Sequence, residues 1–285
     1  MYTLLIQAHE LQQLHADPAH LVVFDCSFDL GQPAAADELF AQSRIAGAQQ
    51  AHLERDLSTH DASQAVNGGR HPLPRPEILA QWLGRMGVDA STQVVVYDRN
   101  AGHYCARLWW MLKWLGHEAV AVLDGGLQAW QALGGALDSG PVPVVEPRHF
   151  ESRPALVHLV RIEQVAAQLG RPQQTLIDAR ATARYRGEVE PLDPVAGHIP
   201  GALNRPFVEN FTASGHFKPA SQLRTEFEAL LAGRPASSVV HHCGSGVTAA
   251  PNLLAMEIAG LHGAGLYAGS WSEWCTTPNM PCAQG

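Results

Sequence analysis

Four short motifs occur twice along the chain, in the same order each time. The pairs are VVFDCS (22–27) and TLIDAR (175–180), RIAGAQQ (44–50) and HIPGALN (198–204), QVVVYD (93–98) and SVVHHC (238–243), and LDGGLQAW (123–130) and YAGSWSEW (267–274). The offset between partners drifts from 153 residues (Asp25 to Asp178) to 145 residues (Asp98 to Cys243), as differences in loop length would produce. Four matches in one register predict two tandem copies of a single fold.

The boundaries of the two copies follow from the composition of the chain between them. Residues 137–154, LDSGPVPVVEPRHFESRP, are rich in proline and should run extended as a linker. We therefore expect an N-terminal domain over residues 1–138, a linker over 139–154 and a C-terminal domain over 155–285.

Short β-branched runs alternate with helical patterns within each copy. TQVVVYD (92–98) and SSVVHHC (237–243) are continuous apolar runs, as buried parallel strands tend to be. Residues 75–87 and 106–116 carry apolar side chains at helical spacing. This alternation predicts an α/β fold, in which each domain is a mostly parallel sheet flanked by helices. Ligands of such sheets bind beyond the carboxyl ends of the strands, and Cys243 follows one of these ends.

Composition excludes several classes of function. The chain has 285 residues and a formal net charge of -8, which favours neither nucleic acid nor an acidic membrane surface. No apolar stretch of about 18 residues could span a membrane, and the N-terminus has neither the basic start nor the cleavage site of a signal peptide. The five cysteines are odd in number and form no CxxC pair, so we expect reduced thiols in a cytoplasmic protein and no structural zinc.

Cys243 ends an apolar run and leads directly into a glycine-rich loop and a helix. The loop consists of Gly244, Ser245, Gly246, Val247 and Thr248. Glycine lets successive backbone amides turn inward, which makes an anion-binding nest, and the helix adds partial positive charge at its N-terminus. A thiolate in such a cradle is a ready nucleophile at neutral pH. We therefore predict that Cys243 is the nucleophile, whereas the other four cysteines lack this setting and should be structural or surface thiols.

The first copy provides an internal comparison. Asp98 stands in the place of Cys243, and the residues after it, RNAGHYC, do not suggest a comparable cradle. We expect the first domain to have become structural and to form one wall of the cleft. A cysteine phosphatase is disfavoured as well, because the arginine that would clamp a phosphate is replaced by Ala249.

With the tandem repeat and CGSGVTAA (243–250) both present, the chain resembles the two-domain rhodanese superfamily of sulfurtransferases, and within it most closely the enzymes that use 3-mercaptopyruvate. Further matching segments are DARATARYRGE (178–188), AGHIPGALNRPF (196–207), ARLWWMLKWLGH (106–117), DGGLQAW (124–130) and GSWSEW (269–274). The resemblance implies that Cys243 takes sulfur from a small-molecule donor as a persulfide and passes it to a thiol, a thioredoxin-like protein or cyanide. It implies no metal and no organic cofactor, and the loop amides would hold the persulfide charge.

The resemblance also assigns roles to four side chains. Ser245 would help to deprotonate or orient the nucleophile or the donor thiol. Arg186, in RYRGE, would bind the donor's carboxylate, for which its planar fork is suited. The first-domain motifs HLERDLS and GGRHPLP match segments that bring a carboxylate and a histidine toward the loop, which here are Glu54 and His71.

Two features of the sequence bear on the donor. The residues after Cys243 are neutral, as in the mercaptopyruvate enzymes, whereas thiosulfate-preferring relatives carry basic side chains there. A second arginine that many mercaptopyruvate enzymes carry is absent from VEPLDPVAGHIPG (189–201), which keeps thiosulfate:cyanide sulfurtransferase open as the alternative. An alternative of another class is a catalytically silent rhodanese-like binding module; such modules commonly lose the cysteine or the open loop, and both are present here.

Overall fold

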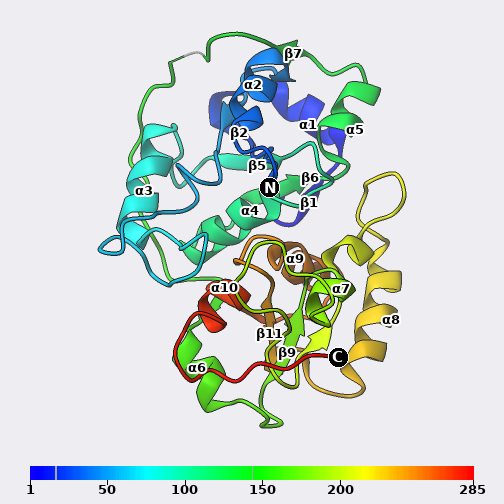
Figure 1. Ribbon diagram of the computed structural model, residues 1–285. Coiled ribbons are helices and arrows are strands. Elements are labelled where there is room, and N and C mark those ends of the chain that lie inside the picture. Colours follow the sequence, from blue (N-terminus) through cyan, green and yellow to red (C-terminus); the bar gives the residue numbers. More distant parts are fainter. Residues whose placement is uncertain (17, 143) are drawn as a thin grey trace. The chain divides into compact units, whose positions relative to one another are not determined.

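The computed structural model describes residues 1–16, 18–142 and 144–285, and the chain forms two compact units (Figure 1). The first unit comprises Met1–Ser58, Pro74–Leu156 and Phe211–Phe217, and the second comprises Thr59–Leu73, Val157–Asn210 and Lys218–Gly285. Each half of the sequence therefore contributes a short segment to the unit that the other half mainly builds. The domain boundaries at residues 138 and 155 stay a prediction.

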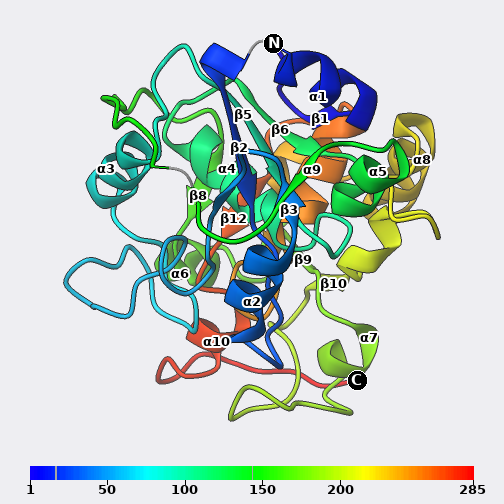
Figure 2. The same cartoon turned by 90° about the horizontal axis from the view of Figure 1, so that it is seen from above.

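The first unit contains a five-stranded parallel sheet in the order β1-β6-β5-β2-β4. Its strands are β1 (Leu5–Ile6), β2 (Leu21–Asp25), β4 (Gln49–Gln50), β5 (Gln93–Tyr97) and β6 (Val120–Leu123). β2 and β5 pair along their whole length and lie side by side in Figure 2. Both read as continuous apolar runs because helices cover both faces of the sheet.

Five helices flank this sheet. They are α1 (Ala8–His15), α2 (Ala35–Gln42), α3 (Pro76–Arg85), α4 (Cys105–Trp114) and α5 (Gly126–Ala132). Side chains of α1 and α5 pack in one cluster with Val23 and Val95. Residues next to these in the strands point to the other face, where the ring of Phe24 lies 5.3 Å from that of Trp82 on α3.

The second unit repeats this sheet. Its strand order is β10-β9-β11-β12-β8, again all parallel. The strands are β8 (His158–Val160), β9 (Thr175–Asp178), β10 (Leu203–Asn204), β11 (Val239–His242) and β12 (Gly265–Tyr267). Every repeated motif occupies the same place in both sheets, so the predicted tandem α/β fold is confirmed.

Helices of the second unit also cover both faces of its sheet. They are α6 (Ile162–Ala167), α7 (Thr182–Tyr185), α8 (Ala220–Leu231), α9 (Ala250–Ile258) and α10 (Ser270–Trp274). The described residues also form short 3-10 turns at Pro18–His20 in the first unit and at Phe207–Asn210 and Ala236–Ser238 in the second. α6 and α10 pack with Val240 in one cluster. On the other face, His241 contacts Phe227 of α8 and Met256 of α9.

The predicted linker begins as a strand of the first unit. β7 (Leu137–Asp138) pairs antiparallel with β3 (Arg44–Ile45). Farther along, the amide of Gly140 donates to the carbonyl of Ala41 at 2.7 Å, and that of Arg148 donates to Gly84 at 2.8 Å. These bonds tie the described part of the linker to the first unit.

Candidate active site

Cys243 follows directly after β11, at the carboxyl end of the central strand of the second sheet. Its side chain is buried, with 1% of the residue exposed. Its amide donates to Oγ of Ser270 at 3.1 Å, and its carbonyl accepts the amide of Trp271 at 3.0 Å. The amide of Ser272 donates to Gly244 at 2.9 Å, so the first turn of α10 fixes the backbone of the nucleophile.

The glycine at position 246 is required by the shape of the loop. Its φ is +74°, in the left-handed region, and a Cβ there would lie 2.2 Å from the carbonyl oxygen of Ala268. Only glycine tolerates both conditions without strain. The sequence pattern GSG therefore sets the path of the backbone between β11 and α9.

The equivalent loop of the first unit, between β5 and α4, binds an anion with its backbone amides. Both carboxylate oxygens of Asp98 accept backbone amides: Oδ1 from Asn100 and Gly102 at 2.8 Å, and Oδ2 from Tyr104 at 2.8 Å and Cys105 at 3.0 Å. This corrects the expectation that the first loop lacks a comparable cradle. The cradle exists, and the carboxylate of Asp98 fills it, because amide geometry depends on backbone path rather than on the residue types that sequence patterns reveal.

Three of the four equivalent amides in the second unit have no acceptor among the described residues, while the fourth, that of Ala250, donates to the carbonyl of Val247 at 3.2 Å. The two loops have equal length, since Asp98 precedes the first residue of α4 by seven positions and Cys243 precedes that of α9 by seven. The positions equivalent to Asn100, Gly102 and Tyr104 are Ser245, Val247 and Ala249, whose amides donate to nothing in the part of the chain that the structure describes. Three amide donors are thus left without an acceptor among the described residues, in a loop that carries a thiol where the first loop carries a carboxylate.

Ser245 and His71 meet in the second unit. Ser245 Oγ lies 2.7 Å from His71 Nδ1, and both residues are buried. His71 reaches this place because segment Thr59–Leu73 belongs to the second unit. The structure therefore brings together two of the predicted site residues that are 174 positions apart in sequence.

Arginines also gather at the loop, but not the predicted one. A Cβ built on Gly244 would lie 2.9 Å from Arg70 Nη2 and 3.5 Å from Arg184 Nη1. Arg186, by contrast, has a side chain that is 55% exposed, and it pairs with Glu188 at 3.7 Å. The role predicted for Arg186 stays a prediction, whereas Arg70 and Arg184 lie beside the loop.

Arg180 completes the charged surroundings of the nucleophile. It is bidentate to Asp178 (2.7 Å from Nη2 to Oδ2) and donates to Glu190 and to the carbonyl of Gly197. Its guanidinium also lies over the ring of Trp271. Burial lowers the pKa of Arg180, but Asp178, Glu190 and a charge on Cys243 outweigh burial and raise it. Arg180 therefore presents a fixed positive charge near the sulfur.

The four other cysteines are poor candidates for a nucleophile. Burial raises the pKa of Cys26 and of Cys105, and nearby carboxylates raise both further. Burial raises the pKa of Cys275 to about 11, and it also raises that of Cys282. Glu54 lies in the first unit, between β4 and α3, and its predicted role toward the loop stays a prediction.

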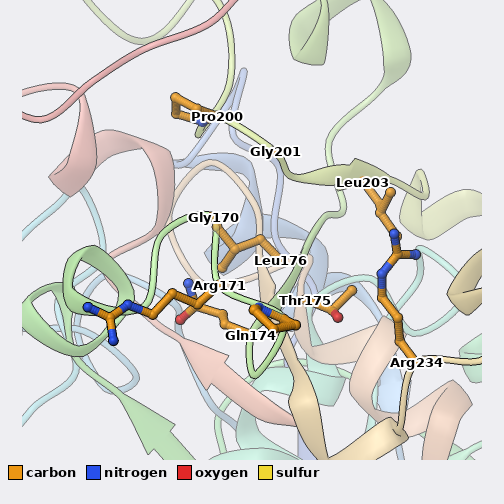
Figure 3. A pocket seen from close by; sticks show the side chains of 10 residues that line it. Gly170, Arg171, Gln174, Thr175, Leu176, Pro200, Gly201, Leu203 and Arg234 are labelled. Atoms are coloured by element: carbon orange, nitrogen blue, oxygen red, sulfur yellow. The ribbon is translucent and has the colours of Figure 1, made fainter.

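A separate hollow lies at the opposite end of the second sheet (Figure 3). It has a volume of about 420 Å³ and is lined by Thr175 at the start of β9 and by Leu203 of β10. The guanidinium of Arg234 points toward Leu203, while that of Arg171 points away. Because ligands of parallel sheets bind at the carboxyl ends of the strands, this hollow is not the expected place for catalysis.

The described residues form neither a metal-binding cluster nor a membrane-spanning helix. No cluster of three or more His, Cys, Asp or Glu side chains among them could hold a metal ion. None of the helices formed by those residues combines the length and the apolar character needed to cross a membrane.

The fold and the loop are those of a known family. The Rhodanese-like domain matches twice, over residues 7–133 and 161–277, so the chain belongs to the rhodanese family. A probable 3-mercaptopyruvate sulfurtransferase of Pseudomonas aeruginosa is 47% identical over 282 residues, which cover 99% of this chain and 98% of that protein.

Two further relatives align over nearly the whole length. A putative thiosulfate sulfurtransferase of Mycobacterium tuberculosis, SseB, is 36% identical over 284 residues, which cover 99% of this chain and 97% of that one. The crystal structure of SseA from Escherichia coli, a 3-mercaptopyruvate sulfotransferase, superposes with a TM-score of 0.76 at 33% identity and covers 95% of this chain and all of that one.

Proposed function

We propose that this protein is a sulfurtransferase that moves a sulfur atom from 3-mercaptopyruvate to a thiophilic acceptor through a persulfide on Cys243. One observation carries the proposal. In the first unit, four loop amides bind the carboxylate of Asp98. The loop after β11 is the equivalent loop of the second unit, and it carries Cys243 at the position of Asp98. A persulfide on this cysteine is an anion one atom longer than a thiolate, which suits a ring of amide donors.

The reaction divides into two half-reactions. The Cys243 thiolate attacks the sulfur of mercaptopyruvate, an S–S bond forms, and the C–S bond breaks with its electron pair passing to carbon. The carbon takes up the proton of the donor thiol and leaves as pyruvate, while Cys243 becomes Cys–S–S⁻. An acceptor thiolate or cyanide then attacks the outer sulfur and releases the Cys243 thiolate. Such covalent transfer gives ping-pong kinetics.

The neighbouring side chains would transfer the proton and bind the donor's carboxylate. The hydrogen bond between Ser245 Oγ and His71 Nδ1 provides a path for the proton that moves from sulfur to carbon. Arg184 is a better candidate than Arg186 for binding the donor's carboxylate, because its guanidinium lies beside Gly244. Glu54 is proposed to act on the same loop on family resemblance alone.

Thiosulfate is the second candidate donor. The relative from Mycobacterium tuberculosis, which aligns over the whole chain, is named a putative thiosulfate sulfurtransferase. The ratio of kcat/KM for the two donors with cyanide as acceptor decides between them, and we expect it to favour mercaptopyruvate. A thioredoxin-like acceptor and a cytoplasmic location remain parts of the proposal, and the five free cysteines are compatible with a reducing compartment.

The test of the function uses Cys243→Ser and, as a matched control, Cys275→Ser. After treatment with mercaptopyruvate, mass spectrometry of the wild-type protein should find one added sulfur on the peptide that contains Cys243. Cys243→Ser should lose sulfur transfer, and Cys275→Ser should keep it, since the raised pKa of Cys275 leaves it a poor nucleophile. Sulfur on another cysteine, or transfer by Cys243→Ser, would refute the assignment.

A further inference from the structure

Two arginines from distant parts of the sequence lie side by side at Gly244. Measured from a Cβ built on Gly244, Nη2 of Arg70 is 2.9 Å away, and Nη1 and Nη2 of Arg184 are 3.5 and 3.7 Å away. Gly244 directly follows the nucleophile, and a Cβ at this position would press on the guanidinium of Arg70. The absence of a Cβ leaves room for two guanidinium groups next to Cys243.

One carboxylate holds both arginines. Asp193 accepts a hydrogen bond from Nη1 of Arg70 and another from Nη2 of Arg184, the latter at 3.2 Å. Arg184 Nη2 also donates to Glu190 at 2.6 Å. The side chains of Asp193 and Glu190 are 2% and 4% exposed. Buried carboxylates of this kind fix the orientation of a guanidinium, because Arg loses little freedom per hydrogen bond once it is anchored.

Donor groups remain on both arginines after these bonds are counted. Arg70 Nη2 and Arg184 Nη1 donate to no acceptor among residues 1–16, 18–142 and 144–285, and Arg184 Nε is buried without a partner. A buried donor such as Arg184 Nε is normally satisfied, whereas the side chains of Arg70 and Arg184 are 27% and 20% exposed and can be reached by a ligand. Donors that are held in place yet lack an acceptor, beside a nucleophile, are suited to an anionic ligand.

The backbone of Arg70 is fixed by the same helix that fixes Cys243. Its amide donates to Ser272 Oγ at 3.0 Å, and the amide of Gly68 donates to Glu273 Oε1 at 2.6 Å. Ser272 and Trp271 in turn donate their amides to Gly244 and Cys243. α10 therefore sets the distance between Arg70 and the nucleophile.

We propose that Arg70 is the second donor-binding arginine of this enzyme, and that it forms with Arg184 a pair that binds the carboxylate of a 2-oxo acid donor beside Cys243. The proposal rests on the proposed function. Arg70 would then replace the second carboxylate-binding arginine that is absent from residues 189–201, and it comes from segment Thr59–Leu73 of the N-terminal half. Asp193 is then a positioning residue, which holds both guanidinium groups without contacting the donor.

The charges around the pair indicate which donor fits. Three cations and three carboxylates are linked here by ion pairs: Arg70, Arg180, Arg184, Asp178, Glu190 and Asp193. The cluster is neutral as a whole, so it offers directed hydrogen bonds rather than a strong positive field. A planar monoanionic carboxylate gains most from such a fork, whereas a dianion such as thiosulfate needs excess positive charge.

The test compares Arg70→Gln and Arg70→Lys with Arg75→Gln, a matched control whose side chain is 55% exposed and pairs only with Glu77 among the described ion pairs. We expect Arg70→Gln to raise the KM for mercaptopyruvate about 10- to 100-fold with kcat changed less than about threefold, the pattern of lost substrate binding. Arg70→Lys keeps the charge for Asp193 but not the fork, so its KM should lie between those of Arg70→Gln and the wild type. Arg75→Gln should match the wild type.

Binding of pyruvate, measured by calorimetry on the same four proteins, separates this inference from the proposed function. Pyruvate carries the same carboxylate and needs no sulfur transfer to bind. Weaker pyruvate binding by Arg70→Gln and Arg70→Lys supports the role of Arg70 even if turnover of mercaptopyruvate is not found. A KM and a pyruvate affinity within about twofold of wild type in both variants would overturn it. If Arg70→Gln does not fold, Arg70→Lys alone decides by the same criterion.

Discussion

Asp98 and Cys243 occupy the same position in two copies of one fold, and they show two uses of one backbone arrangement. In the first unit the ring of amides is satisfied by a carboxylate from its own chain. In the second, a thiol stands there and the equivalent amides of Ser245, Val247 and Ala249 have no acceptor in the described structure. At this position the first loop supplies its own anion, whereas the second carries a thiol and leaves three equivalent amides without an acceptor among the described residues.

Cys243→Asp tests this equivalence. We expect it to abolish sulfur transfer but to be more stable than Cys243→Ser by about 1–3 kcal/mol at pH 7, because a carboxylate accepts charge-assisted hydrogen bonds from amides and a hydroxyl does not. Urea unfolding of the two variants measures the difference. An aspartate variant that is less stable than the serine variant would show that the loop is not an anion cradle.

The site residues that the sequence predicted are those that local patterns mark. Cys243 and its loop stand out because glycine and helix-start signals are local. Arg70 gives no such signal, since its nearness to Gly244 arises only when distant segments fold together. Arg184 and Arg186 point in different directions, which a sequence motif does not show. A helix turns by about 100° per residue, so residues two positions apart on α7 and its C-cap lie on opposite sides. Only Arg184 then faces the loop.

At the scale of elements, β11 carries a buried histidine, His241, two residues before the nucleophile. His241 is fully buried, with Nε2 3.0 Å from Met256 Sδ, and its Nδ1 has no hydrogen-bond partner among the residues that the structure describes. Burial lowers its pKa to about 3, helped by the charges of His242 and Arg205. The imidazole of His241 on β11 is therefore neutral at neutral pH.

Stability should fall in acid because of this residue. Unfolded, His241 has an ordinary pKa near 6.5; above that value it is neutral in both states, and between about 6.5 and 3 only the unfolded chain binds the proton. Unfolding free energy should thus drop by about 2 kcal/mol from this group between pH 7 and pH 5. Urea unfolding at both pH values should show a smaller drop in His241→Leu than in the wild type, with exposed His9→Gln as control. An equal drop in His241→Leu would contradict the assignment.

The secondary elements were predictable because each repeats. Continuous apolar strands and helix-spaced side chains predicted the alternation of strands and helices and the mostly parallel sheet of each copy. The short strands β1 and β8, of two and three residues, carry too little pattern to be seen without their partners β6 and β12. Pairing with a neighbour, rather than intrinsic preference, places them.

At the scale of the whole molecule, the two compact units do not coincide with the two halves of the sequence. Thr59–Leu73 belongs to the second unit and Phe211–Phe217 to the first. Sequence repeats reveal the ancestral halves, but an exchanged loop leaves no periodic signal. Hence Arg70 and His71 are parts of the second unit, although the next segment of that unit begins only at Val157.

This exchange predicts the behaviour of separate pieces. Residues 155–285 expressed alone lack His71 and Arg70, so we expect no measurable sulfur transfer from mercaptopyruvate. Co-expression with residues 1–154 supplies Thr59–Leu73 and should restore activity in a complex of the two pieces, measured by thiocyanate formation. Full activity of the C-terminal piece by itself would show that the segment is dispensable.

The same exchange sets an order of events during synthesis. Arg70 leaves the ribosome 173 residues before Cys243, and the helix that receives its amide, α10, is made after both. Until the second half is made, the stretch from 59 to 73 lacks Asp193, Ser245 and Ser272, which Arg70 and His71 contact in the folded chain. A nascent chain therefore cannot bring Cys243 together with Arg70 in this arrangement before α10 has been synthesised.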